Sequence, residues 1–169
     1  MIRILGAFVM ALVVAYLVSV AGASTHVVQQ FQAMPGAPAV GMGDRLQWLI
    51  ADVVGMAKVG LYPALLAIAL AIAFSTATLI ARFIPNWRFV GYILAGGVGL
   101  LVLHLAVTQA VGTHAVAASR TIAGLVWQVA AGALAGWIYG RIDRTANKRG
   151  LQDSDAHPNE VGQASNEVG

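Results

Sequence analysis

Long apolar runs alternate with short polar segments along this chain. The runs are Ile4–Val20, Leu61–Ala81, Phe89–Ala110 and Thr121–Gly140, and none of them contains an Asp, Glu, Lys or Arg. Each has close to the roughly 20 residues that a helix needs to cross the hydrocarbon of a bilayer. The pattern predicts an all-α fold, an integral membrane four-helix bundle with spans at about 4–22, 61–81, 89–110 and 121–140.

The first run also has features of a secretory signal sequence, because Arg3 precedes it and Ala21-Gly22-Ala23 follows it as an A-x-A cleavage site. However, the apolar stretch is longer than the 7–15 residues typical of a signal sequence. Small residues also recur along it at the four-residue spacing of a packing helix, namely Ala7, Ala11, Ala15 and Ser19. We therefore expect this run to be retained as a span. Cleavage would leave three spans.

The segment 23–60 is the one sizeable polar connection between the runs, and its polar first part, 24–34, could extend the first helix. Pro35-Gly36 and Pro38 interrupt it, and Asp44 is a typical residue for a helix N-terminus. In a helical projection, residues 45–59 separate into an apolar and a polar face. We expect a periplasmic loop followed by a short amphipathic helix on the membrane surface. The alternative is one long second span that is kinked at Pro63.

Composition agrees with a membrane protein. Hydrophobic residues make up 59% of the chain and charged residues 10%, whereas soluble domains average about 25% charged residues. The absence of cysteine excludes disulfides, thiolate metal ligands and cysteine nucleophiles. The net charge of +3 is not gathered into a groove-reading element, so we expect the lipid bilayer as a partner and no nucleic acid.

The basic residues instead flank the spans unequally, which sets the orientation. One side of the bundle receives Arg3, Arg82, Arg88, Arg141, Arg144, Lys148 and Arg149, and the other receives Arg45, Lys58 and Arg120. The positive-inside rule then predicts a multi-pass protein of the bacterial inner (plasma) membrane with both termini in the cytoplasm. We expect the polar segment 141–169 to be a disordered cytoplasmic tail, and an inert tail is favoured over a regulatory contact.

Small residues recur at four-residue spacing in the last two runs. Close approach of helices through such positions is a common way of packing in membranes. We predict that the two stripes pack on each other; docking of a partner subunit and incidental glycine content are the alternatives. The residues are Gly91, Ala95 and Gly99 in the third run, and Gly124, Gly132, Gly136 and Gly140 in the fourth.

Polar side chains inside the spans are few, and such residues are candidates for function. His104 and Thr108 lie in the outer half of the third run, and Gln128 lies at a similar depth in the fourth. A contact between His104 and Gln128 is therefore feasible. His104 could form a proton-sensitive site, although an interhelical hydrogen bond is the simpler interpretation.

No catalytic set, metal site or cofactor motif is present: the sequence has no G-x-S-x-G, phosphate loop or H-E-x-x-H. We therefore predict no enzymatic activity. The expected function is that of an accessory, assembly or scaffold subunit that packs with a membrane-protein partner or as a homo-oligomer. The alternative is an oligomeric small-solute transporter or channel with His104 as its intramembrane polar site, and a membrane enzyme is the least favoured class.

Overall fold

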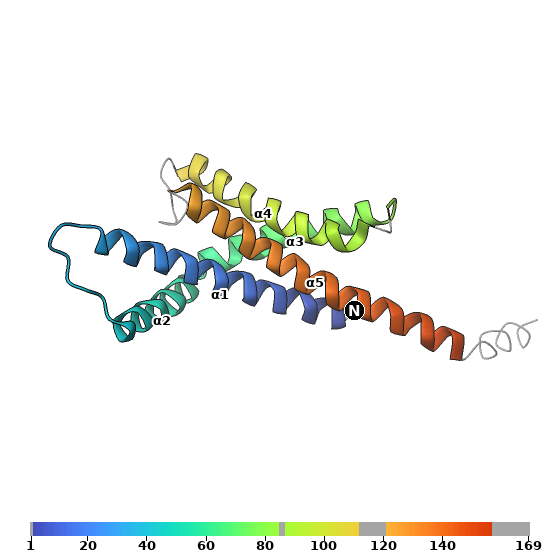
Figure 1. The fold of residues 1–169 in the computed structure, drawn as a ribbon. Coiled ribbons are helices and arrows are strands. Elements are labelled where there is room, and N and C mark those ends of the chain that lie inside the picture. The colour runs from blue at the N-terminus through green and yellow to red at the C-terminus, as the bar shows by residue number, and fades with distance from the viewer. Residues whose placement is uncertain (1, 85–86, 112–120, 157–169) are drawn as a thin grey trace, which may run out of the picture.

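The chain folds as helices joined by short connections (Figure 1). The computed structural model describes residues 2–84, 87–111 and 121–156, and within these ranges there is no strand. The helices are α1 (Ile2–Gln32), α2 (Met42–Val59), α3 (Leu61–Ala81), α4 (Arg88–Val111) and α5 (Ile122–Ala156).

Four of these helices, α1, α3, α4 and α5, are long and apolar enough to cross a membrane. Their outer faces carry large apolar side chains that are more than half exposed, such as Leu5, Ile72, Leu94 and Val126. Apolar surface of this extent is unfavourable in water but suits the interior of a bilayer. The prediction of an all-helical bundle with four membrane-length apolar helices is confirmed.

Helix α5 lies between α1 and α4, and α4 packs in turn on α3. A shorter contact between α1 and α3 closes the bundle. Neighbouring helices run in opposite directions (Figure 1), so the start of α1, the end of α3 and the start of α4 lie at one end. We call this the basic end, because it carries Arg3, Arg82, Arg88, Arg141 and Arg144. The opposite end carries α2.

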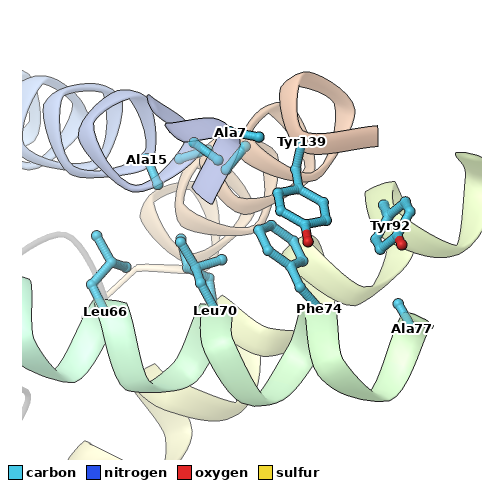
Figure 2. Packing of buried hydrophobic residues seen from close by; sticks show 12 residues of the cluster. Ala7, Ala15, Leu66, Leu70, Phe74, Ala77, Tyr92 and Tyr139 are labelled. Atoms are coloured by element: carbon cyan, nitrogen blue, oxygen red, sulfur yellow. The ribbon is translucent and has the colours of Figure 1, made fainter. Parts of the chain in front are cut away.

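The core combines small side chains on α1 with large ones on α3. Figure 2 shows Ala7 and Ala15 of α1 facing Leu66 and Leu70 of α3, and all four are buried. Small residues on one helix let the large side chains of its neighbour fill the space between them. The buried face of α1 thus contains the alanines whose four-residue spacing marked it as a packing helix.

Aromatic rings continue this core toward the basic end. Phe74 of α3 stacks on Tyr139 of α5 with ring centroids 4.5 Å apart, and it meets Tyr92 of α4 edge-on at 6.1 Å (Figure 2). The Tyr92 hydroxyl lies 3.0 Å from the Thr78 hydroxyl of α3. One aromatic cluster therefore joins three of the membrane-length helices.

Gly60 separates α2 from α3. Its backbone is left-handed (φ 73°, ψ −19°), and its N–H donates to the carbonyl of Met56 at 3.3 Å, which is a common way for a helix to end. Pro63 lies in the first turn of α3, where the missing N–H costs little. The alternative of one continuous helix kinked at Pro63 is therefore wrong. The position of α2 on a membrane surface stays a prediction.

Helix α1 runs to Gln32, in line with a first helix that extends into 24–34. Helix α5 is longer than expected, because it runs past Gly140 to Ala156. The expectation of a disordered tail from residue 141 is therefore wrong for 141–156, while 157–169 lies outside the described residues. Near the start of this extension, Asp143 adds an ion pair to α4.

Candidate functional site

Glycines bring α4 and α5 into backbone contact. A Cβ on Gly132 would overlap the carbonyl oxygen of Gly96, and a Cβ on Gly136 would overlap that of Tyr92 and lie 3.0 Å from the Cα of Ile93. At such distances, dispersion and Cα–H···O contacts contribute to association in the absence of a hydrophobic driving force. Two glycines of the predicted α5 stripe therefore do pack against α4.

The other two glycines of that stripe have different surroundings. Gly140 lies beside the ring of Phe89, whose Cδ2 would be 3.1 Å from an added Cβ. Gly124 is buried near the start of α5, and its N–H donates to the Thr121 hydroxyl at 3.0 Å, as in an N-terminal helix cap. Only part of the stripe is thus a helix-approach site.

The predicted partner stripe on α4 faces elsewhere. Gly99 lies against Ala73 of α3, because a Cβ added to Gly99 would be 3.0 Å from the Cβ of Ala73. A Cβ added to Gly91 would meet nothing within 4 Å. The prediction that Gly91, Ala95 and Gly99 pack on α5 is therefore wrong. Gly96, one position along from Ala95, makes that contact, because successive residues point about 100° apart around a helix.

Gly91, Ala95 and Gly99 instead line a groove of about 680 Å³ between α3 and α4. The groove extends from Leu65 and Leu103 to Arg88 at the basic end, so it follows most of the length of both helices. Its floor is formed by small side chains of both helices, and its rims by large ones. The rims include Ile68, Ile72, Ile80, Leu94, Val98 and Val102.

A cluster of polar side chains lies inside the bundle on the side of α2. The Ser19 hydroxyl of α1 donates to the side-chain oxygen of Gln128 on α5 and is hydrogen-bonded to the Tyr62 hydroxyl of α3. The Gln128 amide N–H donates back to the Ser19 carbonyl at 3.3 Å. Ser19 and Gln128 are both buried. The cluster therefore links three helices through groups that satisfy one another.

Gln128 does not bond to His104, the contact that their similar depth made feasible; it bonds to Ser19. His104 has its Nδ1 2.8 Å from the Leu100 carbonyl of its own helix, and a carbonyl only accepts hydrogen bonds, so Nδ1 carries the hydrogen. Its Nε2 is buried without a partner within the described residues. Thr108 donates to the His104 carbonyl at 2.8 Å, so its hydroxyl is also satisfied inside α4.

The His104 ring still borders the polar cluster, because it meets the Tyr62 ring edge-on with centroids 6.4 Å apart. The backbone carbonyl is the nearer partner because a helical side chain can reach its own preceding turn. Gln128 turns to α1, which supplies both a hydroxyl and a backbone carbonyl. The depth of His104 and Gln128 along their spans could not predict which hydrogen-bond partner each of them has.

The basic end has polar contacts that the sequence did not single out. Arg88 and Asp143 form an ion pair at 2.9 Å between α4 and α5, with Asp143 only 12% exposed. Arg141 lies over the Trp137 ring at 4.7 Å, and Arg144 lies over the Phe89 ring at 5.3 Å. These contacts order a basic surface where the helices end.

Sequence reasoning also missed Tyr62 and Ser19 as members of a polar cluster. Ser19 was recognised only as a small packing residue; its place on the alanine face of α1 was the available signal. Tyr62 follows Gly60 in an apolar run, and nothing local distinguishes it from an interface aromatic residue. Together with Gln128 and His104, these two side chains do not form a catalytic set of nucleophile, base and orienting group.

Comparisons with known proteins add no relative: no family model, curated protein or solved structure matches this chain.

Proposed function

We propose that this chain is a non-enzymatic multi-pass protein of the bacterial inner membrane that serves as an accessory, assembly or scaffold subunit. In this proposal, the α3–α4 groove receives a transmembrane helix of a partner membrane protein. The basic end faces the cytoplasm, in line with the positive-inside rule, and α2 lies at the opposite surface. The groove is the observation that carries the proposal.

Three properties of the groove favour a helix as its occupant. It follows the helices over most of their length, as a membrane-spanning segment would. Its floor has the small-xxx-small spacing that lets helix backbones approach, in Gly91, Ala95 and Gly99. At Gly91 that floor is open, since an added Cβ would meet nothing within 4 Å. The other close glycine contacts, between α4 and α5, are already used inside the bundle.

Photo-crosslinking tests the proposal in native membranes. A photoreactive residue at Leu94, on the groove rim, should give one discrete protein adduct, whereas the same residue at Leu5, an exposed site on α1, should not. Gly91→Leu fills the open floor and should abolish the adduct. Gly6→Leu is the matched control, because an added Cβ there also meets nothing within 4 Å.

Two outcomes would change the proposal. An adduct of twice the mass of this chain would make a second copy the occupant and the protein a homo-oligomer. Docking in the groove would be contradicted if the adduct at Leu94 persists in the Gly91→Leu variant. It would also be contradicted if the photoreactive residue at Leu94 gives no protein adduct in native membranes.

A second function, an oligomeric small-solute transporter or channel, is favoured by one observation. His104 carries a buried ring nitrogen without a partner among the described residues, and intramembrane ionisable groups often mark ion pathways. Against it, Ser19, Tyr62 and Gln128 satisfy one another, so a polar path would have to break these bonds. If this function holds, proton flux into proteoliposomes should be lost in the His104→Leu variant. Equal flux in the wild type and in this variant would contradict the transporter or channel function.

A further inference from the structure

A second cavity lies between α4 and α5 at the basic end, and it shares no lining residue with the α3–α4 groove. It has a volume of about 370 Å³ and is lined by Phe89, Arg141, Arg144 and Thr145. The Thr145 hydroxyl donates to the Arg141 carbonyl at 3.0 Å, so the hydrogen-bond donors available to a ligand are those of the two guanidinium groups.

Aromatic rings position these guanidinium groups. Arg141 lies over Trp137, one turn earlier on α5, and Arg144 lies over Phe89, which α4 contributes. Contacts of a guanidinium with a ring face are favourable and restrict the long side chain. Gly140 contributes indirectly, because its missing side chain leaves room for the Phe89 ring. The cavity is therefore built from both helices.

No carboxylate among the described side chains compensates the charge of this cavity. Arg141 and Arg144 are three positions apart and so lie on the same face of α5, where like charges repel. Among the side chains that the structure describes, which do not include those of 146–156, the Arg88–Asp143 contact is the one ion pair, so neither arginine has a carboxylate partner there. An anion between the two guanidinium groups would remove the repulsion, and paired guanidinium forks match phosphate oxygens well.

Apolar surface adjoins the cavity on the side of the membrane interior. Trp137 and Leu134 lie one and two turns below Arg141 on α5, and they are 40% and 39% exposed. Trp is enriched where hydrocarbon meets headgroups. A ligand that uses both features has an anionic head and an apolar tail.

We propose that Arg141, Arg144 and Phe89 form a site for the phosphate of an anionic phospholipid, whose acyl chains lie along Trp137 and Leu134. Basic pockets between helices at a membrane surface suit such headgroups. The proposal requires that the bundle sits in a bilayer, but it does not depend on the accessory role or on the α3–α4 groove.

The test uses the full chain in nanodiscs and measures bound lipid by native mass spectrometry. Phosphatidylglycerol should be retained in preference to phosphatidylcholine. Arg141→Gln with Arg144→Gln should lower its affinity by about 5-fold for each arginine. Arg3→Gln with Arg82→Gln is the matched control, since it removes the same charge from the same end outside the cavity, and it should leave the preference intact.

Two further arms identify the source of the phosphate and the role of geometry. Inorganic phosphate should not displace the lipid at concentrations near that of the bound lipid; displacement there would overturn the assignment to a lipid. Arg141→Lys with Arg144→Lys keeps the charge but loses the planar forks, so it should weaken retention. Retention equal to the wild type in these Lys variants, or equal losses in the two Gln pairs, would mean diffuse charge attraction and would overturn the site.

Discussion

Gly96 and Gly132 face each other across α4 and α5, and a Cβ on either residue would overlap the backbone carbonyl oxygen of the other. The contact lies between the most extensively packed pair of helices. Because the overlap would be with backbone rather than with a movable side chain, the helices would have to separate to admit even a methyl group.

Alanine substitution should therefore separate two classes of glycine. Gly132→Ala should destabilise the bundle by about 1–3 kcal/mol through overpacking, measured by SDS-induced unfolding in mixed micelles. Gly91→Ala should not destabilise the bundle, because its added methyl meets open space and alanine is the better helix former. Equal effects at both positions would contradict the assignment of Gly132 to the internal interface and Gly91 to the groove.

The hydrogen bond between Ser19 and Gln128 gives a second prediction. Ser19→Ala should cost roughly 0.6 kcal/mol, the average for interhelical hydrogen bonds in membranes, and at most about 1.7 kcal/mol. Gln128→Leu should cost a similar amount, and the double variant should cost less than the sum because the two groups are partners. A double-mutant cycle in the same unfolding assay measures this coupling. Strict additivity would show that the bond does not contribute to stability.

The sequence predicted the spans well and the faces of the helices less well. The charge-free runs determine where a helix can reside in a membrane, so four membrane-length helices follow from hydrophobicity alone. A stripe of small residues shows that a helix approaches something, but it does not identify the neighbour. The choice between Ala95 and Gly96 depends on a rotation of about 100°, which is set by all four helices packing at once.

The polar cluster shows the same limit for the candidate site. Depth placed His104 and Gln128 at the same level, yet Gln128 pairs with Ser19. The missing information was that α5 lies between α1 and α4, because adjacency in sequence had suggested only α4 as the neighbour of α5. Tyr62 enters the cluster from α3 for the same reason, since the bundle closes where α3 meets α1.

The ion pair between Arg88 and Asp143 should stabilise the basic end. Asp143→Asn removes the carboxylate charge and leaves Arg88 partly buried without its partner, which should cost about 1–3 kcal/mol, between the values for exposed and buried pairs. Asp52→Asn, on α2 and outside any ion pair within the described residues, is the control and should change stability little. Unfolding of the two variants at equal salt makes the comparison. An equal, small effect would show that the pair contributes nothing.

Helix α1 should be retained rather than removed as a signal sequence. The candidate cleavage site, Ala21-Gly22-Ala23, lies within the continuous helix α1. Gly22 contacts the Trp127 ring, whose N–H donates to the Val18 carbonyl at 2.8 Å. An N-terminal and a C-terminal epitope tag should therefore be found on the same polypeptide after membrane insertion. Loss of the N-terminal tag from the membrane-bound protein would contradict this prediction.

The orientation of the bundle can be tested directly because the chain has no cysteine, so a single introduced cysteine is a unique label site. Met42 at the start of α2 is 83% exposed and Phe83 at the basic end is 81% exposed, which makes them a matched pair. With the basic residues in the cytoplasm, a membrane-impermeant maleimide should label Met42→Cys in intact spheroplasts and Phe83→Cys only after lysis. The reverse result would invert the bundle. Labelling of both sites before lysis would place the start of α2 and the end of α3 in the same compartment, which would contradict a single membrane crossing between them.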